Sequence, residues 1–237
     1  MKITMKQQEK YIYEYPRPSV TTDCVIFGFD EGELKVLLIE RSIEPFIGQW
    51  ALPGGFVGEE ETAEECAQRI LLKETCLDNI YMEQLYTFSD VERDPRFRVI
   101  SIGYYALVKL SDYNAQAGMD TTNIKWFSIS DVPKLAFDHM KILEVAKERL
   151  KGKIKYQPIG FELLPEKFTL PDLFHLYKTV LQTDLDDRNF RKKILSYGLL
   201  IDTGEMQRGA RNRAPKLYSF DKDRYEELTK TGFYFEL

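Results

Sequence analysis

The sequence has 237 residues, 43% of them hydrophobic and 13% aromatic, which is enough to bury a sizeable core in one large or two smaller domains. The formal net charge is −5, and no apolar run approaches the roughly 18 residues of a membrane span, so we expect a cytoplasmic protein that does not enter a membrane. Three cysteines without a C-x-x-C spacing and only two histidines argue against a disulfide framework, a zinc cage and a histidine-rich metal site.

The first part of the chain predicts a mixed β-sheet flanked by helices. The capping box Thr62-x-x-Glu65 predicts a helix that ends near Leu77, and apolar residues at helical spacing predict another helix at residues 138–151. We expect this domain to comprise residues 1–152. β-Branched and apolar runs predict strands at residues 20–29, 34–40, 80–88, 98–109 and 125–128, the first two forming a hairpin.

The rest of the chain, residues 153–237, predicts a second domain. The capping box Thr169-x-x-Asp172 predicts a helix, and a tight connection at residues 182–185 leads to the next element. Further predicted elements are a helix at residues 186–196, hairpin strands at residues 199–203 and 216–220, and a short strand at residues 159–164. Two helices, a short turn and a hairpin resemble a winged helix-turn-helix. The expected fold class is therefore α+β and α/β, a mixed sheet flanked by helices and followed by a winged helix-turn-helix.

One motif in the first domain resembles a known metal site. Leu52-Pro53-Gly54-Gly55 is followed after five residues by Glu61, after seven more by Arg69, and then by Leu71, Glu74 and Leu77. This spacing resembles the Nudix box, whose helix carries Arg-Glu-aliphatic-x-Glu-Glu. The three glutamates of that motif fall at i, i+3 and i+4 and gather on one helical face, where they hold magnesium for the cleavage of a diphosphate.

The metal-binding part of this motif is degraded. Ile70, Lys73 and Glu74 occupy the three glutamate positions, and Cys76 replaces the glycine that usually ends the helix. An alkyl group cannot ligate magnesium, and an ammonium group repels it by an energy of order 1–4 kcal/mol, depending on screening. We therefore expect no metal, no cofactor and no catalytic residue, and a domain that binds a ligand without turning it over. The alternative is a Nudix hydrolase that acts on nucleoside diphosphate derivatives.

A ligand pocket can remain after the metal chemistry is lost, because binding needs only shape and a few polar groups. The candidates lie around the glycine turn, in the mixed-charge loop at residues 90–98 and on the box helix. The predicted effector-binding residues are Arg41, Phe46, Trp50, Lys73, Glu74, Asp90, Arg93 and Arg98. The simpler interpretation is core packing for Trp50 and solvation for the charges of the loop.

The second domain carries a basic segment. Between Arg188 and Lys216 there are eight basic residues against Asp202 and Glu205. Arginine and asparagine can read base edges, and arginine and lysine neutralise phosphates, so we expect double-stranded DNA as a partner. The predicted DNA-binding residues are Arg188, Asn189, Arg191, Lys192 and Lys193 on the second helix, and Arg208, Arg211, Arg213 and Lys216 in the wing. The alternative is a basic tail that binds another protein.

A further resemblance rests on the damaged box, Phe168-Thr169-Leu170, the run Arg188-Asn189-Phe190-Arg191-Lys192-Lys193, and Gly198-Leu199-Leu200. In these features the chain is similar to the Nudix-related transcriptional regulators. The resemblance covers nearly the whole chain apart from residues 1–18. It implies a homodimer on a two-fold operator and an effector that alters DNA affinity, and we expect a repressor. Family members respond to ADP-ribose or to pentoses such as L-arabinose. Because arginines alone would have to hold a diphosphate here, we expect a pentose, with ADP-ribose as the alternative.

Overall fold

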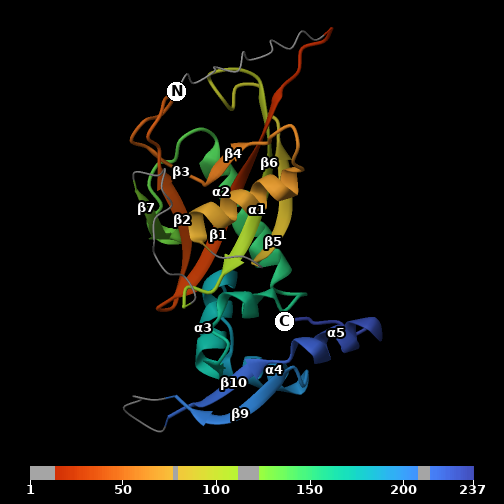
Figure 1. Cartoon of the computed structure of the whole chain (residues 1–237). Helices are drawn as coiled ribbons and strands as arrows, with labels where there is room; N and C mark the ends of the chain where they lie inside the picture. The colour runs from red at the N-terminus through yellow and green to blue at the C-terminus, as the bar shows by residue number, and fades with distance from the viewer. Residues whose placement is uncertain (1–13, 77–79, 112–122, 208–213) are drawn as a thin grey trace, which may run out of the picture.

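The structure, a computed structural model, describes residues 14–76, 80–111, 123–207 and 214–237. An N-terminal domain built on one large sheet is followed by a smaller C-terminal domain, which lies at one end of it (Figure 1). Among the described helices, none has both the length and the apolar character needed to cross a membrane.

The described part of the N-terminal domain contains a seven-stranded mixed sheet. The main order is β3-β2-β1-β6-β5, and β4 pairs with β1 while β7 pairs with β2. β1 and β6 run parallel, and the other strand pairs are antiparallel. The strands are β1 (Ser19–Asp30), β2 (Glu33–Glu40), β3 (Trp50–Ala51), β4 (Gly54–Phe56), β5 (Tyr81–Phe88), β6 (Val99–Val108) and β7 (Ile124–Ser128), and a 3₁₀ helix, η1 (Ile129–Asp131), follows β7.

Two helices flank this sheet. α1 (Ala63–Thr75) begins with the predicted capping box, in which the Thr62 hydroxyl accepts the Glu65 N–H at 3.2 Å and the Glu65 carboxylate accepts the Thr62 N–H at 2.7 Å. α1 ends at Cys76, whose φ of 56° is the left-handed conformation for which glycine is preferred at this position. α2 (His139–Lys153) forms where the second helix was predicted.

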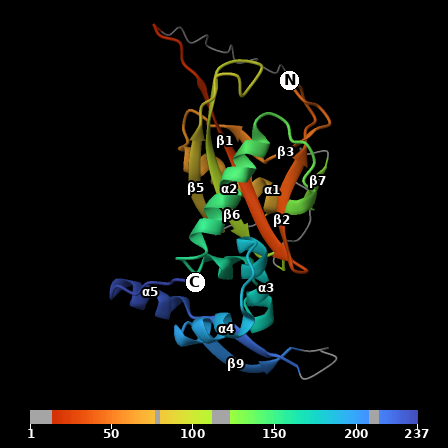
Figure 2. The ribbon, with the colours of Figure 1, turned by 180° about the vertical axis from the view of Figure 1, so that it is seen from behind.

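β1 is buried on both faces because a helix covers each side of the sheet. Val25 and Phe27 pack into the core under α2, and the alternate residues Cys24 and Ile26 pack into a second core under α1. Figures 1 and 2 show α1 and α2 on opposite faces of the sheet. A strand covered on both sides has no polar face, which explains why β1 is a continuous apolar run.

The C-terminal domain is a winged helix. α3 (Leu170–Leu181) ends at Gln182, whose φ is 52°, and a short connection leads to α4 (Asp187–Ser196). Phe190 of α4 packs against Tyr177 of α3 with ring centroids 5.3 Å apart. The remaining elements are a sheet of order β8-β10-β9, formed by β8 (Phe168–Thr169), β9 (Leu200–Met206) and β10 (Lys216–Phe220), and a terminal helix, α5 (Lys222–Lys230). The predicted fold class is confirmed.

Two segments differ from the prediction. η2 (Ile159–Leu163) is a 3₁₀ helix where a short strand was predicted, and the strand prediction was wrong. A Cβ on Gly160 would approach side-chain atoms of Ile154 and Tyr177 to 3.1 and 3.2 Å, so this segment fills the domain junction instead of joining a sheet. α5 was not predicted, although Asp221 caps it by accepting a hydrogen bond from a backbone N–H of its first turn.

One apolar core continues from the N-terminal domain through the junction into the C-terminal domain. Leu163 of η2 and Leu173 of α3 belong to the same buried cluster as Val25 of β1. On the surface of the junction, the Thr179 hydroxyl of α3 donates to the Gly32 carbonyl at the tip of the β1–β2 hairpin, at 3.0 Å. The domain boundary between residues 152 and 153 stays a prediction.

Candidate functional site

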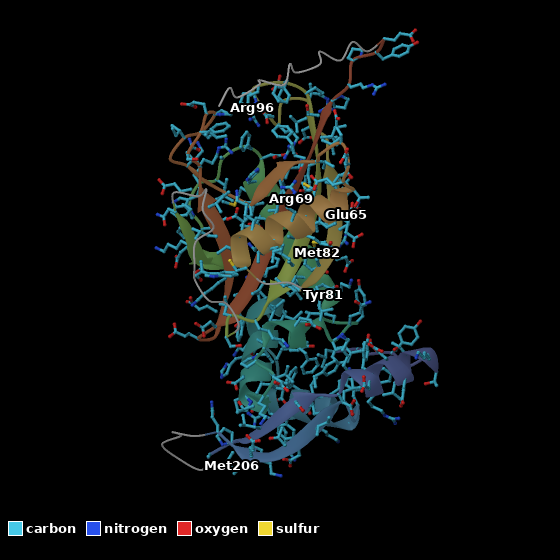
Figure 3. The ribbon with its side chains drawn as sticks, viewed as in Figure 1. Glu65, Arg69, Tyr81, Met82, Arg96 and Met206 are labelled. Atoms are coloured by element: carbon cyan, nitrogen blue, oxygen red, sulfur yellow. The ribbon has the colours of Figure 1, made fainter. Side chains whose placement is uncertain are left out.

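A cavity of about 200 Å³ opens in the N-terminal domain. Residues from β1, the end of β2, β4, the loop between β5 and β6, and the segment before α2 line it. Arg96, one of these residues, lies at the opposite end of the molecule from Met206 of β9 in Figure 3. The lining residues that matter for its chemistry are Asp23, Arg41, Arg93, Arg96, Phe137 and His139.

A buried polar network supports this cavity. The Arg93 side chain is only 4% exposed and donates two hydrogen bonds to Asp138, at 3.0 and 2.7 Å, and one to Asp23 at 3.1 Å. Asp23 also accepts a hydrogen bond from the Ser101 hydroxyl at 2.5 Å. These contacts join the loop between β5 and β6 to β1 and to the residue that precedes α2. Arg93 therefore anchors this loop through buried contacts.

His139 extends the network to the glycine turn of the box. Its Nδ1 accepts a hydrogen bond from the Leu52 N–H at 2.9 Å, and its Nε2 lies 3.5 Å from Asp23 Oδ1. Burial lowers the pKa of His139, so the neutral ring with the proton on Nε2 fits both contacts. A Cβ on Gly54 would stand 2.4 Å from Asp23 Oδ1, which explains why this turn requires glycine.

Two arginines and two phenylalanines, Phe56 and Phe137, line the cavity, and the ring of Phe97 stacks on that of Phe56. The Arg41 guanidinium lies 4.7 Å from the Phe137 ring centroid. The Arg96 guanidinium lies 5.6, 5.5 and 5.7 Å from the rings of Phe56, Phe97 and Phe137. Phe137 has a φ of 52°, a conformation that costs a non-glycine residue about 1–2 kcal/mol. Such strain is concentrated at ligand sites, where the surrounding structure maintains it.

The two guanidinium groups act on each other. Burial lowers the pKa of Arg41, and the positive charge of Arg96 lowers it further, while Asp94 and Asp23 act in the opposite direction. Asp94 holds Arg96 by two side-chain hydrogen bonds, at 3.0 and 2.7 Å. An anion in the cavity would offset the repulsion between the arginines. The cavity is therefore better suited to an anionic ligand than to a neutral one.

The intact part of the box serves a structural purpose. Glu61 accepts hydrogen bonds from Arg69 at 2.6 and 3.0 Å and from the Gly58 N–H at 2.8 Å. The hydrogen bonds from Arg69 are the main reason why the pKa of Glu61 falls to about 2. Figure 3 shows Arg69 on α1, so this pair ties the loop after β4 to the helix.

The residues at the magnesium positions of the box do not fit a magnesium ion. Ile70 is 4% exposed and packs into the core under α1 with Cys66 and Leu71. Lys73 is exposed and Glu74 is buried. In the part of the chain that the structure describes, no group of three or more His, Cys, Asp or Glu side chains is placed to hold a metal ion. The set of oxygen ligands that a hard cation requires is therefore incomplete.

Two of the predicted effector-binding residues, Arg41 and Arg93, line the cavity. Phe46 lies beside it, with its ring centroid 4.8 Å from that of Phe137. Arg96 and Phe137 were missing from the predicted set. Arg96 belongs to the mixed-charge loop that contains Arg93, so its charge was a signal, but charge alone did not show which side chains face inward. Phe137 gave no signal, since its position depends on contacts distant in sequence.

The other five predicted effector-binding residues do not line the cavity. The Trp50 ring packs edge-on against β7, in agreement with the simpler interpretation of core packing. Asp90 forms a surface ion pair with α2, and Arg98 donates to backbone carbonyls of its own loop. Lys73 and Glu74 both lie on α1.

α4 presents most of the predicted DNA-binding side chains on its outer face. Phe190 and Ile194 are buried against the rest of the domain, which fixes the opposite face outward. Arg191 is half-buried and its Nε lies 2.7 Å from Asp187 Oδ1, one helical turn earlier. The exposed members of the predicted set on this helix are Arg188, Asn189, Lys192 and Lys193.

The wing is described only in part. Lys216 is exposed and forms an ion pair with Asp202 across the hairpin at 2.6 Å. The predicted residues Arg208, Arg211 and Arg213 lie outside the described residues. The predicted DNA-binding side chains that the structure places are thus those of α4 and Lys216.

Two family models match this chain. The NUDIX domain model covers residues 17–146, and the model of the NrtR DNA-binding winged helix domain covers residues 160–220. The ADPR responsive transcriptional repressor NtrR of Acinetobacter baylyi is 35% identical over 217 residues, which span 90% of this chain and 86% of that protein.

Solved structures are similar to both parts of the chain. The crystal structure of Shewanella oneidensis NrtR complexed with a 27mer DNA has a TM-score of 0.79 and 36% identity, and the match covers 87% of this chain and 95% of that chain. The NUDIX domain of the same Shewanella protein, complexed with ADP ribose, has a TM-score of 0.53 and 38% identity over 57% of this chain and 90% of that one. The chain therefore belongs to the NrtR family, in which a Nudix domain precedes a DNA-binding winged helix domain.

Proposed function

We propose that this protein is a transcriptional repressor that binds double-stranded operator DNA and responds to ADP-ribose. The observation that carries the effector assignment is the placement of Arg41 and Arg96 on one cavity beside aromatic rings. The ADPR responsive repressor of Acinetobacter baylyi and the ADP ribose complex of the Shewanella NUDIX domain support it. These findings favour the ADP-ribose alternative over the pentose that the sequence led us to expect.

The chemistry of the cavity explains how a diphosphate is held without magnesium. A guanidinium group offers fixed pairs of N–H donors to phosphate oxygens, and each hydrogen bond to a charged group contributes about 1.5–3 kcal/mol. The diphosphate offsets the repulsion between Arg41 and Arg96, while the ring of Phe56 or Phe137 can stack on the adenine base. A neutral pentose would not offset the repulsion between Arg41 and Arg96, of which only Arg96 is paired with a carboxylate, that of Asp94, in the described contacts.

The buried network around Arg93 holds the walls of this site in place. A binding site is most effective when its side chains are held in place before the ligand arrives. Arg93 fixes the loop that carries Arg96, and His139 fixes the glycine turn on the opposite wall. The network thus positions the two walls of the cavity relative to each other.

DNA binding is assigned to α4 and the wing. In a winged helix-turn-helix the second helix enters the major groove, with its N-terminal residues nearest to the base edges. Arg188 and Asn189 occupy that position in α4, while Lys192 and Lys193 are placed to neutralise phosphates. A two-fold homodimer would place two copies of α4 about 34–36 Å apart, on two halves of one operator.

Hydrolysis of nucleoside diphosphate derivatives is the competing function. The buried alkyl group of Ile70 and the exposed ammonium group of Lys73 oppose it, because neither supplies an oxygen ligand. The purified protein with magnesium and ADP-ribose is expected to release no AMP. Magnesium-dependent release of AMP above a protein-free control would support the enzyme instead.

Calorimetric titration tests the effector directly. ADP-ribose should bind the unmodified protein, and L-arabinose should not. Arg96→Gln should lower the affinity for ADP-ribose by roughly 10-fold or more, because one or two charge-assisted hydrogen bonds are lost. Arg98→Gln is the matched control, because Arg98 comes from the same loop and lies outside the cavity. Binding of L-arabinose, or equal binding of ADP-ribose by both variants, would contradict the assignment.

A further inference from the structure

α2 connects the effector cavity to the domain junction. Asp138 and His139 at its start belong to the buried network beside the cavity. The helix then runs for 15 residues to Lys153, and Ile154 directly after it is fully buried. A helix of this length measures about 22 Å and moves largely as one body. A shift of its first turn therefore also shifts its last turn, which lies at the junction.

Residues 233–237, which we call the C-terminal strap, return to this end of α2. The Leu237 N–H donates to the Lys155 carbonyl at 2.9 Å, and Phe235 is only 2% exposed. Figures 1 and 2 both show the C-terminal end of the chain beside the junction end of α2. The strap lies beyond the residues that the winged helix model matches.

The C-terminal strap also holds the end of α4. Tyr197, the residue that caps the C-terminus of α4, donates its hydroxyl hydrogen to the Glu236 carbonyl and accepts the Glu236 N–H at 3.2 Å. Its ring centroid lies 5.5 Å from that of Phe233 and 5.2 Å from that of Phe235. The five residues of the strap thus contact the last turn of the predicted recognition helix and the end of α2 at once.

The opposite side of the junction leaves room for one domain to tilt. There α3 meets the β1–β2 hairpin through the hydrogen bond from Thr179 to Gly32. Cavities of about 390 and 680 Å³, both lined by Gly32, flank this contact. Because a close-packed core resists rotation, the apolar core that crosses the junction allows only a small tilt, and the two cavities leave room for it beside the contact of Thr179 with Gly32.

We propose that the C-terminal strap transmits the state of the effector cavity to α4. A ligand that moves the start of α2 moves its end as well, the strap displaces Tyr197, and α4 changes its orientation towards the DNA. This mechanism rests on the proposed function, since it specifies how the effector cavity and the DNA-binding helix of the same protein are coupled.

Coupling is measured as the ratio of DNA dissociation constants with and without saturating ADP-ribose, for which about 5–150-fold is typical of allosteric proteins. Phe235→Ala should bring this ratio close to one while ADP-ribose still binds with its original affinity. Tyr234→Ala is the matched control, because Tyr234 is the preceding residue of the strap and is 86% exposed. Its ratio should stay within about twofold of that of the unmodified protein.

Tyr197→Phe covers the case in which Phe235→Ala unfolds the C-terminal domain. It keeps the ring contacts and removes only the hydroxyl that bonds to Glu236, and it should lower the ratio in part. If DNA binding and ADP-ribose binding both persist in these variants and the ratio is unchanged, the strap does not carry the coupling.

Amide hydrogen exchange provides a readout that needs no effector. In the unliganded full-length protein, Phe235→Ala should speed exchange at the amides of both Leu237 and Glu236, which donate to the Lys155 carbonyl and the Tyr197 hydroxyl, whereas Tyr234→Ala should not. Faster exchange at only one of these places would refute the strap as a link. If the unmodified protein failed to bind ADP-ribose, the proposed effector would be wrong, and the exchange result alone would then decide whether the strap joins α2 to α4.

Discussion

Replacement of Arg93 by methionine should destabilise the N-terminal domain strongly. The substitution removes three hydrogen bonds, and it takes away the positive charge that pairs with Asp23 and Asp138. The side chains of these two residues are only 8% and 14% exposed, so water cannot replace the lost contacts fully. Asp23 retains its contacts with Ser101 and His139, whereas Asp138 loses both of its bonds from Arg93. Removing one partner of a buried ion pair typically lowers the free energy of unfolding by about 3–5 kcal/mol.

Urea unfolding followed by tryptophan fluorescence measures this effect. A loss of that size should lower the midpoint by roughly 1–5 M, given a slope of about 1–3 kcal/mol per molar urea. Lys141→Met is the matched control, because the pair of Lys141 with Asp90 at 2.5 Å also joins this loop to α2 but is exposed on both sides. Its midpoint should barely move. Equal midpoints for the two variants would refute the view that Arg93 anchors the cavity.

Three further predictions concern charge. Arg69→Ala should raise the pKa of Glu61 from about 2 towards its ordinary value of 4.5, which carboxyl NMR titration measures. A pKa that stays near 2 would show that Arg69 does not lower it. Burial lowers the pKa of His139 in the folded state below its ordinary value of 6.5. The neutral ring therefore contributes stability above about pH 6.5, and this stability is lost as the pH falls through the folded-state pKa. The urea midpoint of the unmodified protein should therefore drop more than that of His139→Asn between about pH 7.5 and about pH 5, and parallel drops would contradict this. Lys192→Ala should weaken DNA binding and reduce the slope of log K against log salt by roughly one, whereas Lys147→Ala in the N-terminal domain should leave both unchanged.

Local sequence signals predicted the elements well. The Thr62 and Thr169 capping boxes mark the true starts of α1 and α3, because the cap is formed by residues three apart and needs no tertiary contact. The first hairpin follows for the same reason, since its two apolar runs are joined by a short turn. α5 could have been found from Asp221, which stands before a helical segment as a capping residue.

The cavity could be predicted only in part, because distant residues build it. Arg93 is 70 residues from Asp23 and 45 from Asp138 in sequence, so charge patterning within the loop cannot show that it is buried while Arg98 is not. The box spacing directed attention to Lys73 at one of the metal positions, and this residue lies outside the cavity. The preference for a pentose assumed that arginines alone make a poor diphosphate site, whereas Arg41 and a second arginine face one cavity.

We propose that a ligand of the Nudix domain controls DNA binding, and fluorescence anisotropy with a labelled fragment of the tightest-binding genomic region tests this. The dissociation constant for DNA should change by about 5–150-fold when ADP-ribose is added, and adding L-arabinose should have no effect. The double variant Arg41→Gln/Arg96→Gln should bind the same fragment without responding to ADP-ribose. A DNA affinity that responds to L-arabinose, or that does not change with ADP-ribose in the unmodified protein, would rule out ADP-ribose as the controlling ligand.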